Sequence, residues 1–194
     1  MTMSFFPDEV QVESTSRYTK LNKGTTTLRM LGTPLFYYET WLNNEDGSRS
    51  PKRFAMNEEI PLSECGPDGV KQVMSIKAYN YNTKNIQVWS ISQKTILKAV
   101  KAYSENKKYG DPTGYDINIE KVGEGKQTRY NVIADPKEEL SKAVVEADKA
   151  QNVDLDALLI NADPFMKSAA PTTVDKSELN IEVKADGVDS SIPF

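Results

Sequence analysis

The chain of 194 residues contains no histidine and a single cysteine, Cys65. Without histidine, Ser-His and Cys-His nucleophile pairs, histidine acid-base catalysis and histidine metal ligands are all excluded. With one cysteine, neither a disulfide framework nor a cysteine-rich zinc site forms within the chain. We therefore expect a protein that is not an enzyme and that has no cofactor and no metal ion.

Long apolar runs are also lacking. No stretch approaches the roughly 18 to 20 consecutive apolar residues of a transmembrane helix. Residues 1–13 carry three acids and no basic residue, unlike a secretory signal. We expect a cytoplasmic protein that does not contact a membrane.

The charge is unevenly distributed, although the formal net charge of the whole chain is only -4. Residues 17–134 carry 18 Lys and Arg against 12 Asp and Glu, a net of +6. Residues 135–194 carry 6 Lys against 13 acids, a net of -7. We predict a loose arm over 1–16, a folded basic domain over 17–165 and a disordered acidic tail over 166–194.

Segments rich in β-branched and aromatic residues alternate with turn formers through most of the body. The strand-like segments are 26–31, 35–42, 51–56, 70–79, 84–91, 115–122 and 128–133. The polar and Gly-rich stretches between them, such as 43–48 and 123–127, predict three hairpins.

One clear helix is predicted over residues 90–108. Its first four residues, Ser-Ile-Ser-Gln, have the spacing of a capping box, and Ile96, Val100 and Tyr103 recur near a 3.6-residue period. Gly110 and Pro112 follow as stop signals.

A second helix is predicted to begin at Asp135, with Pro136 at its first position. Its apolar stripe would be Leu140, Val144 and Ala147. Helical character is expected again at 154–161.

The order of these elements predicts a mainly β fold with inserted helices. Five or six strands with a helix after about the fourth fit a small barrel of the OB type, whose sheet face and loops bind oligonucleotides. An α+β sandwich is the alternative.

Motifs for catalysis are incomplete. The stretch 123–128 shares a Gly-Lys pair with phosphate-binding loops, but Glu120 and Gln127 stand where such a loop needs Gly and Ser or Thr. The acid pairs Asp111 with Asp116 and Asp154 with Asp156 occupy positions typical of turns and helix ends. Neither feature indicates a reaction.

Aromatic and basic residues are interleaved on the predicted strands instead. Proteins that hold single-stranded nucleic acid use this combination, because cations follow the phosphates while rings stack on bases, each stack contributing about 1 to 3 kcal/mol. The candidate DNA contacts are Arg29, Tyr37, Trp41, Lys52, Arg53, Lys77, Tyr79, Tyr81 and Lys84.

The alternation of side chains along a strand predicts which of these residues share a face. Tyr37 and Trp41 share a face with Glu39, and because burying a carboxylate is costly we expect this face to contact solvent. Lys77, Tyr79 and Tyr81 are expected to face outward as well, opposite Ile76 and Ala78.

The end of the sequence, Asp186 to Phe194, is acidic and finishes in Ile-Pro-Phe. It looks like the C-terminal tip of bacterial single-stranded-DNA-binding proteins, although Ser190 and Ser191 stand where that family has further Asp residues. The resemblance implies that Asp186, Asp189, Ile192, Pro193 and Phe194 bind replication and recombination proteins.

The body is similar to bacteriophage single-stranded-DNA-binding, helix-destabilising proteins over roughly residues 26–133. The similar segments are Thr27-Leu28-Arg29-Met30-Leu31-Gly32 followed by Trp41, Pro51-Lys52-Arg53-Phe54, the stretch from 79–84 through 93–96, and the stretch from 110–117 through Thr128-Arg129-Tyr130. Members with a zinc subdomain have Cys and His ligands where residues 61–70 contain only Cys65, so zinc is not expected.

These features predict a protein that coats and protects single-stranded DNA without sequence preference in phage replication, recombination or repair, in the host cytoplasm. Its acidic tail would compete with DNA for the basic body and recruit partners. The alternatives are an interaction adaptor that does not hold DNA and a nuclease that uses carboxylate-bound metal. Nothing in the sequence specifies an oligomeric state.

Overall fold

The computed structural model describes residues 16–165, and this part of the chain is mainly β with two α-helices. The strands are β1 (Gly24–Asn43), β2 (Arg49–Ala55), β3 (Lys71–Asn80), β4 (Asn85–Ile91), β5 (Asp116–Val122) and β6 (Arg129–Ala134). The α-helices are α1 (Lys94–Glu105) and α2 (Lys142–Ala150), and short 3-10 helices are η1 (Leu62–Glu64), η2 (Pro112–Gly114), η3 (Gly125–Gln127) and η4 (Leu155–Ile160). The predicted mainly β class with inserted helices is confirmed.

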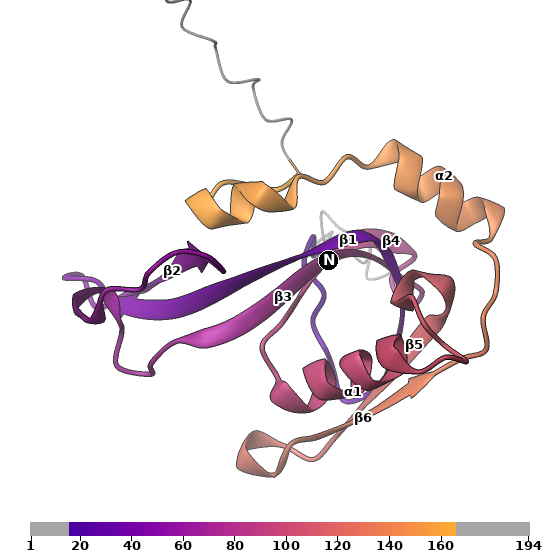
Figure 1. Ribbon diagram of the computed structural model, residues 1–194, viewed down its shortest axis with the longest axis horizontal. Helices are drawn as coiled ribbons and strands as arrows, with labels where there is room; N and C mark the ends of the chain where they lie inside the picture. Colours follow the sequence, from indigo (N-terminus) through magenta and orange to yellow (C-terminus); the bar gives the residue numbers. More distant parts are fainter. Residues whose placement is uncertain (1–15, 166–194) are drawn as a thin grey trace, which may run out of the picture.

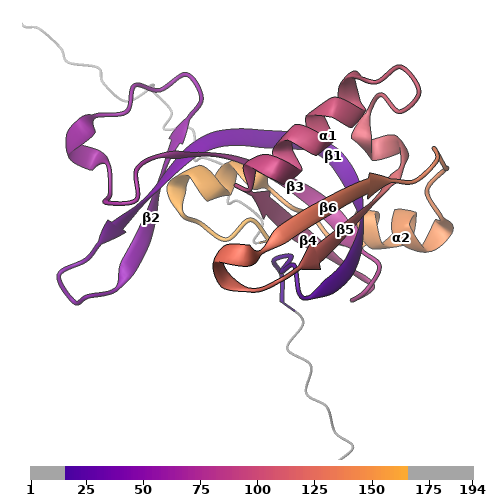
Figure 2. The same ribbon diagram turned by 90° about the horizontal axis from the view of Figure 1, so that it is seen from below.

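All six strands belong to one antiparallel sheet in the order β4-β3-β1-β5-β6, with β2 paired to β1 beside this path. The sheet curls over α1, and the ribbon formed by β1, β2 and the start of β3 projects to one side (Figures 1 and 2). Within residues 16–165 no ladder joins the edge strands β4 and β6, so strand pairing does not close a barrel there.

β1 is a single strand of 20 residues where the sequence pattern predicts two. The predicted break at 32–34 is an irregularity in the ladder, since Leu31 lies opposite Lys77 while Leu35 lies opposite Ser75. Gly32 has a φ of 71°, a left-handed conformation that glycine adopts without a steric penalty. An advance of four residues along β1 thus matches an advance of two along β3. Because both numbers are even, the odd-numbered residues of β1 lie on the same face before and after the irregularity.

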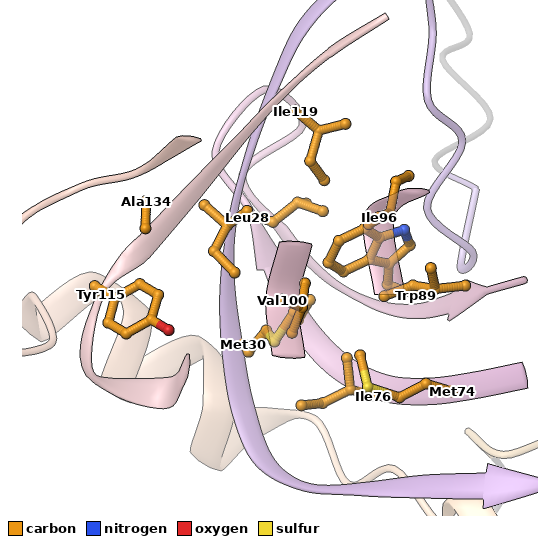
Figure 3. Packing of buried hydrophobic residues seen from close by; sticks show 13 residues of the cluster. Leu28, Met30, Met74, Ile76, Trp89, Ile96, Val100, Tyr115, Ile119 and Ala134 are labelled. Carbon is orange, nitrogen blue, oxygen red and sulfur yellow. The ribbon is translucent and has the colours of Figure 1, made fainter. Parts of the chain in front are cut away.

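The main core fills the space between the sheet and α1 (Figure 3). Ile96 and Val100 of α1 are buried against Met30, Ile76 and Trp89. This confirms the apolar stripe of the first predicted helix. The helix begins at Lys94 rather than Ser90, because Ser90 and Ile91 extend β4 and pair with Ser75 and Met74.

α2 lies on the opposite side of the sheet from α1 (Figure 1). It packs Val144 and Ala147 against Leu31, Tyr79 and Ile86, which confirms these two members of the predicted stripe.

The predicted start of the second helix at Asp135 is wrong, because Ser141 is the N-cap and its hydroxyl accepts a hydrogen bond from Val144 N. The carboxylate of Asp135 accepts instead from Asn118 Nδ2 at 2.8 Å. Leu140 precedes the helix and is exposed. Neither α-helix in residues 16–165 is long and apolar enough to span a bilayer.

Candidate nucleic-acid interface

The strand registers gather most of the candidate residues on one surface, the sheet face opposite α1, here called the outer face. Arg29 lies beside Tyr79, Glu39 beside both Arg53 and Lys71, and Trp41 beside Pro51. The residues of the candidate set on the outer face are Arg29, Tyr37, Trp41, Arg53, Lys77 and Tyr79. Side-chain alternation therefore correctly predicts that Tyr37, Glu39 and Trp41 share a face. It also correctly predicts that Lys77 and Tyr79 share one.

The expectation that this face contacts solvent is wrong for its two central tyrosines. Tyr37 is 1% exposed and Tyr79 is 8% exposed. The segment from Lys142 to Phe165, here called the α2–η4 segment, runs along the outer face and covers Tyr79 (Figure 1), while the Arg53 guanidinium lies 5.7 Å from the centre of the Tyr37 ring. Tyr37 OH also forms a 3.0 Å hydrogen bond with Ser75 Oγ.

The outer-face cations Lys77 and Arg53 are held by the α2–η4 segment. Lys77 Nζ lies 2.6 Å from Asp148 Oδ1. Arg53 Nη1 donates to Leu158 O at 3.0 Å and to Asn161 Oδ1 at 2.8 Å, while its Nε donates to Glu39 Oε2 at 2.9 Å. Each cation is thus neutralised or hydrogen-bonded by groups on folded elements.

Arg29 is enclosed in the structure, with a side-chain exposure of 2%. Its Nε donates to Asp116 Oδ1, and its Nη1 donates to Thr113 O and Glu138 O. A buried guanidinium with three protein acceptors is not available to a phosphate. Its observed role is to join β1, the η2 turn and the chain that follows β6.

Tyr81 and Lys84 belong to the turn between β3 and β4. Tyr81 OH donates to Asp116 Oδ1 at 3.2 Å, and its ring meets that of Tyr79 edge to face at 5.0 Å. Partial burial, and then the nearby Asp116 charge, raise the pKa of Tyr81. Lys84 is exposed and has a φ of 55°.

Trp41 and Lys52 lie on the projecting ribbon. Trp41 is 38% exposed, and its Nε1 donates to Glu39 Oε1 at 3.1 Å. Lys52 lies on the opposite face of the ribbon, with Nζ 2.6 Å from Glu64 Oε2 and 5.6 Å from the centre of the Phe54 ring. Trp41 is therefore an aromatic side chain of the candidate set that solvent reaches.

The loop after β2 fixes the backbone at Trp41. Gly66 packs so closely that a Cβ there would lie 1.9 Å from Trp41 O. Gly66 N donates to Thr40 Oγ1, which in turn donates to Gly69 O. The position of the Trp41 ring thus depends on this loop.

A second candidate surface lies where the main core opens to solvent. No sequence motif predicts a site there. A cavity of about 400 Å³ opens between α1 and the start of the ribbon. Phe36, at its rim, is 44% exposed, and Lys101 of α1 lines it. Lys94 and Lys98 of α1 are also exposed. The sign of this basic helix face in the sequence is the spacing of Lys94, Lys98 and Lys101, which are four and then three residues apart.

Three of the four paired acids have structural roles, and for Asp111 and Asp154 these are the capping roles that their positions predict. Asp111 caps η2 by accepting from Thr113 N, Asp116 binds Arg29, and Asp154 caps η4 by accepting from Asp156 N. Within the described part of the chain, no three Asp, Glu or Cys side chains converge as metal ligands would.

The chain has a distant relative among curated proteins. It is 27% identical over 139 residues to a probable ssDNA-binding protein of Escherichia phage T5. The matched region covers 59% of this chain and 53% of the T5 protein, so the chain spans about half the length of this curated relative. No protein-family model and no solved structure matches the chain.

Proposed function

We propose that this chain binds single-stranded DNA without sequence preference, and that it coats and protects DNA during phage replication, recombination or repair. The observation that carries the proposal is the similarity to the probable ssDNA-binding protein of phage T5. No catalytic step is part of it.

The strand order supports this function. β2 belongs to the connection between β1 and β3 and is left out of this comparison. If the other five strands are numbered along the chain, their order in the sheet is third, second, first, fourth and fifth, and α1 follows the third strand in the sequence. A partly open OB-type barrel has five strands and binds oligonucleotides on the face of its second and third strands and on two loops. In this chain these are the outer face of β3 and β4, the β1 to β3 connection and the β5 to β6 turn.

The proposed DNA contacts combine rings and cations of the outer face, the ribbon and the turn between β3 and β4. They are Tyr37, Trp41, Lys52, Arg53, Lys77, Tyr79, Tyr81 and Lys84, within a DNA-binding domain that comprises residues 17–165. The cations would follow the phosphates and the rings would stack on bases, an arrangement that does not discriminate between sequences. Arg29 supports the framework because its guanidinium is already enclosed.

The acidic C-terminal tail would add partner recruitment. Asp186, Asp189, Ile192, Pro193 and Phe194 lie outside the described residues. Their apolar and acidic side chains suit a basic pocket with an apolar floor on a replication or recombination protein. Removing residues 186–194 should abolish capture of such a partner and raise DNA affinity at low salt.

A fluorescence titration with oligo-dT at two salt concentrations tests the function. Stacking on the exposed Trp41 should quench its emission, whereas Trp89, which is 1% exposed, supplies a constant background. Affinity should fall steeply with salt because bound cations displace counterions from DNA. An adaptor without DNA binding would show no anisotropy change with labelled oligo-dT, and a nuclease would cleave the oligonucleotide in Mg²⁺.

A further inference from the structure

We propose that the α2–η4 segment is a displaceable occupant of the DNA-binding outer face, and that single-stranded DNA binds in its place. This inference rests on the proposed function and names the regulation of the same site. In the described structure the face is closed, and binding requires the α2–η4 segment to leave.

The polar contacts of the α2–η4 segment match those that a phosphate backbone would make. Asp163 Oδ2 lies 2.6 Å from Arg17 Nη1, Asp148 Oδ1 lies 2.6 Å from Lys77 Nζ, and Leu158 O accepts from Arg53 Nη1. Three cations from three places along the chain thus meet oxygen atoms of one continuous segment. The segment is itself acidic, with five Asp and Glu against two Lys.

The apolar contacts match those that bases would make. Val144, Ala147 and Val153 cover the surface formed by Leu31, Tyr79 and Ile86. At the end of the segment, the Phe165 ring meets Tyr18 edge to face at 6.2 Å. Arg17 Cζ lies 5.6 Å from the centre of that ring, so an aromatic ring already stacks beside a cation on this surface.

Few residues of the α2–η4 segment are buried. They are Val144 in α2, Leu158 in η4 and Pro164 after it, and the other contacts of the segment are made by partly exposed side chains. Helices as short as α2, with nine residues, have little stability of their own in water. Segments with few buried apolar contacts open at lower free energy than the core.

The chain just before α2 provides a hinge. Glu138 N donates to Gly114 O, and Glu138 O accepts from Arg29, so the chain is tied to the domain up to this point. Residues 139–141 are exposed and connect this tie to α2. Once its own contacts with the outer face break, this connector lets the α2–η4 segment swing away while β6 and the core stay in place.

A closed face lowers the apparent DNA affinity in proportion to the fraction of molecules that are open. Val144→Asp places a carboxylate against Leu31 and Tyr79 and should open the face. We expect it to raise the affinity for oligo-dT about tenfold or more, if fewer than roughly one molecule in ten is open before substitution.

The test compares the full chain with its Val144→Asp and Ala143→Asp variants, using anisotropy of labelled oligo-dT. Ala143 is an exposed neighbour on α2, so it carries the same charge change without disturbing the packed side. Leu158→Asp repeats the test from η4. Trp89 fluorescence reports whether each variant keeps its core.

Amide hydrogen exchange on the unsubstituted chain provides a readout that needs no variant. Adding oligo-dT should speed exchange over 142–161 while β3 and β5 stay protected. If the chain binds oligo-dT, but Val144→Asp binds no tighter than Ala143→Asp and 142–161 stay protected, the inference fails and the function stands. The surface around Phe36 and the α1 lysines would then be the next one to test for DNA binding. If no form binds oligo-dT, the proposed function fails, and this inference fails with it.

Discussion

Lys77 Nζ on β3 lies 2.6 Å from Asp148 Oδ1 on α2, and both side chains are largely shielded from solvent. The pair joins the outer face to the segment that covers it. Its two members therefore have opposite roles in the proposed mechanism, since Lys77 would bind phosphate and Asp148 would compete with it.

Breaking this ion pair from either side should have opposite effects on DNA binding. Lys77→Gln loosens the α2–η4 segment too, but it also removes the cation that would bind phosphate, and we expect the lost phosphate contact to dominate. It should weaken oligo-dT binding roughly two- to tenfold and reduce the salt dependence by about one phosphate contact. Asp148→Asn should tighten binding by a similar factor, because it loosens the α2–η4 segment. Anisotropy titrations across salt concentrations measure both. A loss of affinity in both variants would show that the pair only stabilises the fold.

Trp41 should contribute stacking rather than charge. Trp41→Ala should cost about 1 to 3 kcal/mol of binding free energy with an unchanged salt slope. It should also remove the fluorescence quench on oligo-dT addition, leaving the emission of buried Trp89. Leu62→Ala is a matched control, because Leu62 is an exposed apolar residue of the β2 to β3 connection without a ring. Equal losses in the two variants would argue against stacking.

Arg29 should matter for stability. Arg29→Met leaves the partly buried Asp116 without its cation, and breaking such a pair from one side costs about 3 to 5 kcal/mol of unfolding free energy. Urea unfolding followed by Trp89 fluorescence measures this. Arg49→Met removes an exposed pair with Asp68 and should leave the urea midpoint unchanged. An Arg29→Met protein that unfolds at the normal midpoint but binds DNA weakly would assign Arg29 to the DNA surface instead.

Tyr115 should make the fold sensitive to alkaline pH. Its burial, and then the Asp111 charge, raise the pKa of Tyr115 to about 12. The folded state holds this proton more tightly than the unfolded state, so its contribution is complete below pH 10 and is lost between pH 10 and pH 12, at up to about 1.4 kcal/mol per pH unit. Tyr115→Phe should have a flatter pH profile of unfolding free energy over that range. Parallel profiles for the two proteins would contradict this origin.

Local patterns in the sequence predict the elements that make up the site. Turn residues and side-chain alternation predict the hairpins, and the 3.6-residue spacing of Ile96 and Val100 predicts α1. The same alternation places Tyr37 with Trp41 and Lys77 with Tyr79 on common faces. These features depend on residues near one another in the chain, so short windows of sequence contain the necessary information.

Which segment covers a face of the sheet depends on residues that are distant in the sequence. Tyr79 is buried by Val144, which is 65 positions further along the chain. Asp135 does not cap a helix because Asn118, on another strand, binds its carboxylate. Strand alternation distinguishes the two sides of a sheet, but it contains no signal for a covering segment.

The irregularity between Leu31 and Leu35 determines which side chains of β1 lie on each face of the ribbon. Deleting one of the residues Gly32, Thr33 and Pro34 would shift the alternation of side chains by one residue. Every later side chain of β1 would then lie on the opposite face of the sheet. Phe36 and Tyr38 would then meet the α2–η4 segment, and Tyr37 and Trp41 would turn toward the side of α1. Three residues without charge or aromatic ring thus decide which chemistry each side of the ribbon presents.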